Sequence, residues 1–362
     1  MIEVGVTHYR LKRGSQVKAV AAVILAAGLG TRMRSRLVKV LHPLAGRPLL
    51  WHVIEGVRQA GVERVVVVVG HQAEAVQRAI GDRVEYAFQE KQLGTGHAVM
   101  QASGALGGFE GTVLVTYGDT PLYRAETYRR LIEEHQRSGA QATLLSTFVD
   151  DPQGYGRVVR DGSGAFGSVV EERDITSDEV RAIKEINTGS YCFEAPLLFE
   201  MLSMLKSDNQ QGEYYLPDVL TLLRQRGLPV GIATLQDATE ALGINDRRQL
   251  AAAERALRVR VLDRLMESGV TIVDPESTYI HPTVTIGRDT TILPFTVIEG
   301  DTEIGEACVI GPNAHIRDAK VASGVAIHSA VVIQSRIGEG ATIEPYTYMC
   351  PGSVVDRGAR VQ

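Results

Sequence analysis

Apolar runs alternate with segments of helical periodicity along the first two-thirds of the chain. Ala19–Ala27, Arg64–Val69 and Thr112–Thr116 are short apolar runs that predict buried strands. Between them, Pro48–Gln59 and Gln72–Ile80 place apolar residues at helical spacing. This alternation predicts βαβ units, and therefore an α/β fold with a mainly parallel sheet covered by helices. Ligands of such sheets bind beyond the carboxyl ends of the strands.

One long helix is predicted where this alternation stops. Residues 245–268 are rich in Ala, Leu and Arg, with Asn245 and Asp246 as candidate N-caps and Gly269 as a candidate stop. A helix at this place would connect two domains. The expected divisions are an N-terminal extension over 1–16, a first domain over 17–244, a connector helix over 245–270 and a second domain over 271–362.

Beyond the connector, the hydrophobic period changes to six. Isoleucine recurs at this spacing from Ile280 to Ile316, and further aliphatic runs begin at Val321 and Ile337. Such a hexapeptide repeat predicts a parallel β-helix of roughly four to five coils, with each aliphatic side chain pointing inward. Glycines after the isoleucines are expected to permit the tight corners. A chance run of isoleucines in a β-sandwich is disfavoured by seven consecutive matches.

Composition and charge exclude several classes of protein. The 362 residues, 44% hydrophobic and 22% charged, are typical of a globular chain of two domains. A net charge of −5 disfavours a nucleic-acid or membrane surface built on bulk charge. No apolar run approaches a membrane span, and Met1–Lys18 lack the apolar core of a signal peptide. Three scattered cysteines predict no disulfide framework and favour the cytoplasm.

A glycine-rich turn follows the first predicted strand. The segment Leu25–Met33 has the sequence LAAGLGTRM, which matches neither the dinucleotide fingerprint nor the P-loop. Backbone N–H groups of such a turn can approach phosphate oxygens, and Arg32 and Lys39 supply positive charge. An ordinary βα turn with solvated basic residues is an equally good interpretation of this motif taken alone.

Several separate blocks together resemble the sugar-1-phosphate nucleotidyltransferases. The first combines LAAGLGTRMRS with KVLHPLAGRPLL around Lys39, although Val38 stands where the family usually has proline. The other blocks are Gln89 with Gln92–Ala98, Tyr117–Asp119, Gly154–Arg157, Glu171 before Arg173-Asp174, Glu185–Gly189, Gly212–Asp218 and Gly243–Arg247. From about Val17 to the chain end, the sequence is most similar to the bifunctional N-acetylglucosamine-1-phosphate uridyltransferase/glucosamine-1-phosphate acetyltransferase family, especially its uridyltransferase domain.

This resemblance implies a fold, a reaction and a set of site residues. The fold is a Rossmann-like nucleotidyltransferase domain followed by a left-handed parallel β-helix. The reaction joins UTP and N-acetylglucosamine 1-phosphate into UDP-N-acetylglucosamine and pyrophosphate, with Mg²⁺ as cofactor. The implied catalytic residues are Arg32 and Lys39, and the implied metal ligands are Asp119 and Asn245. The implied nucleotide-binding residues are Leu25, Ala26, Ala27, Gly28, Gly30, Thr31, Gln89, Gly94 and Thr95, and the implied sugar-binding residues are Tyr117, Gly118, Gly156, Glu171 and Asn187.

Most of these residues also have a plainer interpretation. Asp119 could be a strand-end turn aspartate, Asn245 a helix N-cap and Gln89 an exposed glutamine. Glu171 has charged neighbours and could be an ordinary surface charge. The metal and substrate roles therefore depend on the resemblance.

The resemblance also implies that the second activity of the family is missing. The family's acetyltransferase site needs a basic pair on one coil and a histidine base on the next. Here the first stretch, Ile333–Gly338, lacks the lysine pair, and Pro345 stands where the histidine is expected. The acetyltransferase half is thus expected to be degenerate and short. The β-helix is expected to form a homotrimer, with a monomeric stalk as the alternative.

Two other functions remain open from the sequence. One is a related enzyme, a glucose-1-phosphate thymidylyl-, uridylyl- or adenylyltransferase, because sugar choice depends on a few hydrogen bonds. The other is a non-catalytic regulatory subunit with the same fold. The presence of Arg32, Lys39 and Asp119 disfavours the regulatory subunit.

Overall fold

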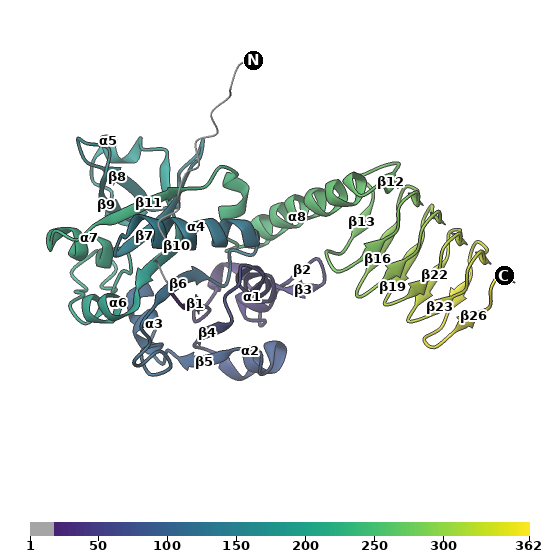
Figure 1. The fold of residues 1–362 in the computed structure, drawn as a ribbon, viewed down its shortest axis with the longest axis horizontal. Helices are drawn as coiled ribbons and strands as arrows, with labels where there is room; N and C mark the ends of the chain where they lie inside the picture. Colours follow the sequence, from purple (N-terminus) through teal and green to yellow (C-terminus); the bar gives the residue numbers. More distant parts are fainter. Residues whose placement is uncertain (1–17) are drawn as a thin grey trace, which may run out of the picture.

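A long helix joins an α/β body to a column of short strands in the computed structural model (Figure 1). The structure describes residues 18–362, so the predicted N-terminal extension over 1–16 lies outside the described residues. The long helix, α8 (Arg247–Glu267), occupies the place of the predicted connector but begins two residues later than expected. Of the residues described, none lies in a helix with both the length and the apolar character of a membrane span.

The α/β body is built on one mixed sheet. Its parallel centre consists of β1 (Val20–Leu25), β4 (Arg64–Val69) and β6 (Thr112–Tyr117), which confirms the three predicted strands. The strand order is β11-β7-β10-β6-β1-β4-β5, and β10 (Glu185–Glu194) runs antiparallel to β6. The remaining strands are β5 (Glu85–Phe88), β7 (Ala142–Phe148), β8 (Arg157–Arg160), β9 (Phe166–Val170) and β11 (Val230–Thr234).

Helices cover both faces of this sheet. The two predicted helices are confirmed as α1 (Leu49–Gln59) and α2 (Ala73–Ile80). Successive side chains of β1 enter different cores: Val23 packs on one face of the sheet and Ile24 on the other, as a strand buried on both faces requires. The other helices are α3 (Thr95–Gln101), α4 (Ala125–Ser138), α5 (Asp178–Arg181), α6 (Ala195–Leu202) and α7 (Asp218–Gln225), with short 3-10 helices η1 (Thr31–Met33), η2 (Lys39–Leu41), η3 (Glu172–Asp174) and η4 (Ala238–Ala241).

The C-terminal column is the predicted parallel β-helix. Short strands from β12 (Thr271–Ile272) to β27 (Arg360–Val361) stack in parallel into three sheets of six, five and five strands. Ile298 pairs with Ile280 on one side and with Ile316 on the other, and all three side chains are buried. The six-residue hydrophobic period therefore corresponds to one side of the coil, as expected.

The predicted role of glycine at the corners is only partly correct. Gly311 has a φ of +100°, but Gly305 is needed for another reason: a Cβ there would lie 2.6 Å from the backbone nitrogen of Ser323 in the next coil. Several corners hold other residues at positive φ, such as Asp289 and Asn313. Glycine thus serves the close approach of coils as well as their turns.

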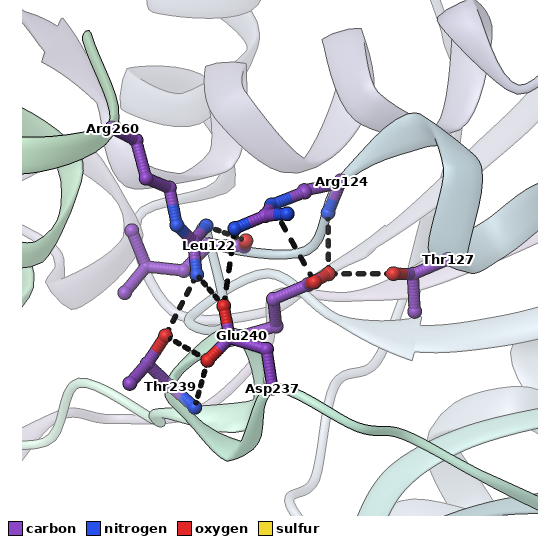
Figure 2. Close-up of polar contacts among 7 residues, drawn as sticks. All are labelled: Leu122, Arg124, Thr127, Asp237, Thr239, Glu240 and Arg260. Atoms are coloured by element: carbon purple, nitrogen blue, oxygen red, sulfur yellow. Dashed lines mark hydrogen bonds and ion pairs between the residues drawn. The ribbon is translucent and has the colours of Figure 1, made fainter. Parts of the chain in front are cut away.

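A polar cluster around the buried Glu240 ties α8 to the α/β body (Figure 2). The Glu240 carboxylate is almost fully buried and accepts hydrogen bonds from the Arg124 backbone at 2.9 Å and the Thr127 hydroxyl at 2.6 Å. Arg260 of α8 pairs with Asp237 at 3.3 Å beside it. Because these contacts join α4, η4 and α8, they fix the direction in which α8 leaves the body.

Candidate active site

The predicted site residues lie along one edge of the sheet. The parallel strands β1, β4, β5 and β6 all end there, and backbone hydrogen bonds join the segments that follow them. The Gly118 N–H donates to the Leu25 carbonyl at 2.9 Å, and the Ala26 N–H donates to the Val68 carbonyl at 2.8 Å. The sheet therefore brings together residues that are far apart in the sequence, at the edge where α/β proteins bind ligands.

Lys39 connects the two residues predicted to bind the metal. Its Nζ donates to the Asp119 carboxylate and, at 3.1 Å, to Oδ1 of Asn245. Gly30 has a φ of +62°, and a Cβ there would lie 2.5 Å from Cβ of Lys39, so glycine lets the glycine-rich loop pack on the lysine stem. The Ile244 N–H donates to the Asp119 carbonyl at 2.9 Å and holds the two segments together.

The oxygen atoms at this point fit a hard divalent cation. The Asp119 carboxylate and the Asn245 amide oxygen converge on the same ammonium group. Mg²⁺ needs few protein oxygens, because it keeps several waters and binds substrate phosphates. Within residues 18–362, no group of three or more His, Cys, Asp or Glu side chains forms a metal site. A Mg²⁺ ion held here would thus take its other ligands from water and phosphate.

Asp246, and not Asn245, caps helix α8. Its Oδ1 accepts hydrogen bonds from the backbone N–H groups of Arg248 and Gln249, both at 2.9 Å. The N-cap interpretation of Asn245 is therefore wrong. Asn245 lies one residue before the cap, and its side chain accepts a hydrogen bond from Lys39.

The glycine-rich loop after β1 combines open space at a glycine with positive charge. Ala26 and Ala27 are buried, and the Ala26 N–H is already bound to the sheet, whereas a Cβ on Gly28 would meet open space. Thr31 and Arg32 line a hollow shared with the start of α8. Val38 has a φ of −56°, which proline also adopts, so the departure from the family pattern preserves the loop conformation.

Gln89 is buried and not an exposed glutamine. Its Nε2 donates to the Gly94 carbonyl at 3.2 Å and lies 3.0 Å from Nδ1 of His97. Gly94 has a φ of +106°, and a Cβ there would lie 2.6 Å from the Tyr214 carbonyl oxygen. The side chain of Gln89 is therefore held in one orientation just after β5.

The segment around Tyr214 supports this loop, a function that the sequence did not reveal. The Gly96 N–H donates to the Tyr214 carbonyl at 2.7 Å, and the Tyr214 N–H donates to the Leu93 carbonyl at 2.8 Å. The Leu216 N–H donates to Oγ1 of Thr95 at 3.0 Å. Most of these contacts use backbone atoms of the supporting segment, so its side chains carried no signal of the role.

Gly156, Glu171 and Asn187 form a second cluster. The Asn187 N–H donates to the Gly156 carbonyl at 2.8 Å, and its side chain hydrogen-bonds the Glu171 carboxyl group. A Cβ on Gly156 would lie 3.0 Å from Oε1 of Glu171. Gly189 packs so closely on the Tyr117 ring that no Cβ fits between them. The structure thus brings Tyr117 and these three predicted sugar-binding residues toward one region.

Burial changes the acidity of this second cluster. Desolvation raises the pKa of Glu171 from about 4.5 to about 7, although the hydrogen bond from Asn187 opposes the shift. Desolvation and the nearby Asp208 and Asp174 likewise raise the pKa of Asp218 to about 6. Glu171 is therefore not an ordinary surface charge. Asp218, whose role the sequence did not indicate, belongs to the same electrostatic environment.

Comparisons with known proteins agree with this arrangement. The profile "MobA-like NTP transferase domain" matches residues 22–171, and "Bacterial transferase hexapeptide (six repeats)" matches residues 283–318. Proteins named "Bifunctional protein GlmU" from Geobacillus sp. (strain WCH70) and Exiguobacterium sp. (strain ATCC BAA-1283 / AT1b) are 48% and 49% identical to the chain over 340 residues, which is 94% of its length. The chain belongs to the GlmU family.

Membership of the GlmU family confirms the predicted fold class and the enzyme class, nucleotidyltransferase. It also contradicts the alternative of a non-catalytic subunit. The chain covers 74% of the Geobacillus relative and 75% of the Exiguobacterium relative. A solved structure, a putative glucose-1-phosphate thymidylyltransferase from Bacillus anthracis, is similar with a TM-score of 0.54 over 65% of this chain and 96% of that chain. At 20% identity, that likeness shows the fold alone.

Proposed function

We propose that this GlmU-family chain transfers the uridylyl group of UTP to N-acetylglucosamine 1-phosphate, with Mg²⁺ as cofactor. The products are UDP-N-acetylglucosamine and pyrophosphate. The observation that carries the proposal is the convergence of Lys39, Asp119 and Asn245 at the carboxyl edge of the sheet. This point adjoins the glycine-rich loop through the contact between Gly30 and Lys39.

The chemistry requires positioning and charge neutralisation. An oxygen of the sugar phosphate attacks the α-phosphorus in line and pyrophosphate leaves; the attacking oxygen is already ionised, so no general base is needed. Bound Mg²⁺ would neutralise phosphate charge, with Asp119 and Asn245 as its protein ligands. Lys39 and Arg32 stabilise the charge that develops on the triphosphate, and losing one such contact costs on the order of 10²-fold in rate.

Residues at the two ends of the site select the nucleotide and the sugar phosphate. The amide of Gln89, with Gly94 and Thr95 beside it, pairs with the uracil edge through its carbonyl oxygen, because Nε2 is directed at Gly94 and His97. The side chains of Glu171 and Asn187 hydrogen-bond the sugar. The choice of nucleotide and the choice of sugar each depend on few polar contacts. A nucleotidyltransferase that uses a related nucleotide or sugar phosphate is therefore the second candidate function.

A substrate panel tests the proposed reaction. The purified chain is given Mg²⁺ and each combination of UTP, dTTP or ATP with N-acetylglucosamine 1-phosphate or glucose 1-phosphate, and pyrophosphate release is measured. The pair of UTP and N-acetylglucosamine 1-phosphate should give the highest kcat/KM. A higher kcat/KM for another pair would contradict the proposed substrates and identify that pair as the preferred one.

We further propose that the chain does not acetylate glucosamine 1-phosphate. Pro345, which cannot accept a proton, follows β24 (Thr342–Ile343) at the place of the expected base. His315 lies two coils before Tyr348 in the same sheet and is paired with Glu299, with 2.7 Å between Nε2 and Oε2. An assay of thiol release from acetyl-CoA should show no turnover, and a rate comparable with uridylyl transfer would reject this proposal.

A homotrimer formed through the β-helix and a cytoplasmic location complete the proposal. The three stacked sheets give the β-helix flat faces that can pack around a threefold axis. Light scattering at micromolar concentration should give three times the chain mass, and the mass of one chain would contradict it. Cys192, Cys308 and Cys350 are all free, which supports a reducing compartment.

A further inference from the structure

The hairpin that follows Lys39 extends from the α/β body to the β-helix (Figure 1). Its antiparallel strands are β2 (Pro43–Leu44) and β3 (Arg47–Pro48), joined by Ala45 and Gly46 at φ values of 42° and 76°. Only His42 separates this hairpin from the 3-10 helix that carries Lys39. A shift of the hairpin would therefore reach Lys39 through a very short stretch of chain.

The turn of the hairpin packs against elements outside the nucleotidyltransferase domain. The Ala45 N–H donates to the Glu254 carboxylate of α8 at 2.9 Å. Gly46 lies directly on the His281 ring at the start of the β-helix, where a Cβ would overlap the ring carbon Cε1 and lie 2.7 Å from Nδ1. These two contacts fix both turn residues against the junction between α8 and the β-helix.

The β-helix itself holds His281 in place. The backbone N–H of Gly300 donates to Nδ1 of His281 at 3.1 Å, and Nε2 lies 3.7 Å from the Glu299 carboxylate. Gly300 and Glu299 belong to the next coil, so the ring is fixed by the stacking of coils. An ion pair of 3.0 Å between Arg47 and Asp301 adds little, because Asp301 is highly exposed.

The other end of the hairpin is tied to the catalytic residues. The His42 N–H donates to the Lys39 carbonyl at 3.1 Å, and the Leu49 N–H donates to the His42 carbonyl at 3.0 Å. Leu44 is fully buried in a small apolar cluster with Ile244, the residue before Asn245. The hairpin therefore contacts the segments of both Lys39 and Asn245.

We propose that the first coils of the β-helix brace this hairpin and thereby position Lys39 for nucleotidyl transfer. Gly46, Glu254 and His281 are positioning residues in this account. The inference rests on the proposed function, and it gives the β-helix a role in nucleotidyl transfer that is independent of acetylation. A displacement of about 1 Å at a reacting group can cost 10²-fold in rate, so a modest loss of bracing is measurable.

Substitutions in the full chain test the brace. Gly46→Ala should lower kcat about tenfold while KM for the sugar phosphate stays within about twofold, because the sugar pocket is elsewhere. Gly227→Ala is the matched control: Gly227 has a φ of +72°, but a Cβ there meets nothing within 4 Å. It should retain kcat within about twofold. Similar losses in both variants would show backbone strain alone and overturn the inference.

A double variant and a second measurement make the test independent of folding and of activity. His281→Ala should also lower kcat, and Gly46→Ala/His281→Ala should be no slower than Gly46→Ala alone, since both changes break one contact. If the two losses of kcat multiply in the double variant, Gly46 and His281 act independently, and this result would contradict their coupling. Amide hydrogen exchange over residues 39–45 should accelerate in either single variant; unchanged exchange overturns the inference even if the substrate panel shows no turnover. If the substrate panel shows no turnover but amide exchange accelerates, the proposed function is rejected and the contact between the hairpin and the β-helix is supported.

Discussion

The raised pKa of Glu171 makes a sharp prediction about sugar binding. With a pKa of about 7, the ionised fraction of this carboxyl group rises from about one-tenth at pH 6 to about nine-tenths at pH 8. Only the carboxylate presents both oxygens as acceptors to sugar hydroxyls, because the protonated group uses one oxygen as a donor. KM for N-acetylglucosamine 1-phosphate, measured at saturating UTP and Mg²⁺, should therefore fall by up to about tenfold over this range.

Glu171→Gln separates this effect from ionisation of the substrate. The sugar phosphate titrates equally for both proteins, so the ratio of their KM values isolates Glu171. KM of the variant should be higher than that of the wild type at pH 8 and should change less with pH. The same pH dependence in both proteins would refute the assigned role of Glu171.

The same shift has a consequence for stability. The folded pKa of Glu171 lies above its usual value near 4.5, so the stability from its protonation is complete below about pH 4.5 and is lost as pH rises through about 7. The full effect is about 3 kcal/mol at most. The wild type should lose stability relative to Glu171→Gln between pH 5 and pH 8 in thermal unfolding, and a constant difference would contradict the shift.

Three substitutions test other parts of the account. Glu240→Ala should destabilise the α/β body by about 3 kcal/mol in denaturant unfolding, because it removes a buried carboxylate from Arg124 and Thr127; a change under about 0.5 kcal/mol would contradict it. Ile316→Ala, at a fully buried position, should cost about 2–5 kcal/mol in unfolding of the β-helix, and a smaller loss would dispute the packed interior. Gln89→Ala should raise KM for UTP about tenfold with little change in kcat; an unchanged KM would reject its contact with the base.

Periodicity made most of the architecture predictable. Five valines in a row from Val65 to Val69 form a strand buried on both faces, and the isoleucine repeat from Ile280 to Ile316 stacks as expected. Both are local signals that follow directly from side-chain spacing. Corner geometry was not predictable in the same way, because Gly305 is required by Ser323 in the next coil and not by its own φ.

The candidate site could be predicted only in part from the sequence. Lys39 and Asp119 stand in recognisable blocks, and the structure brings them together. The role of Asn245 depended on which residue caps α8, and Asp246 resolves this through its own hydrogen bonds. The backbone contacts of Tyr214 left no side-chain signal, and the bracing contact of Gly46 depends on the juxtaposition of two domains.

Asp119→Ala tests the central claim most directly. The variant is compared with Asp82→Ala, which changes an exposed aspartate of the same domain. Formation of UDP-N-acetylglucosamine from UTP and N-acetylglucosamine 1-phosphate is followed over a Mg²⁺ titration. We expect Asp119→Ala to lose at least about 10²-fold in kcat/KM with little change in melting temperature, while Asp82→Ala keeps wild-type turnover. Unaltered turnover and Mg²⁺ dependence in Asp119→Ala would contradict the account.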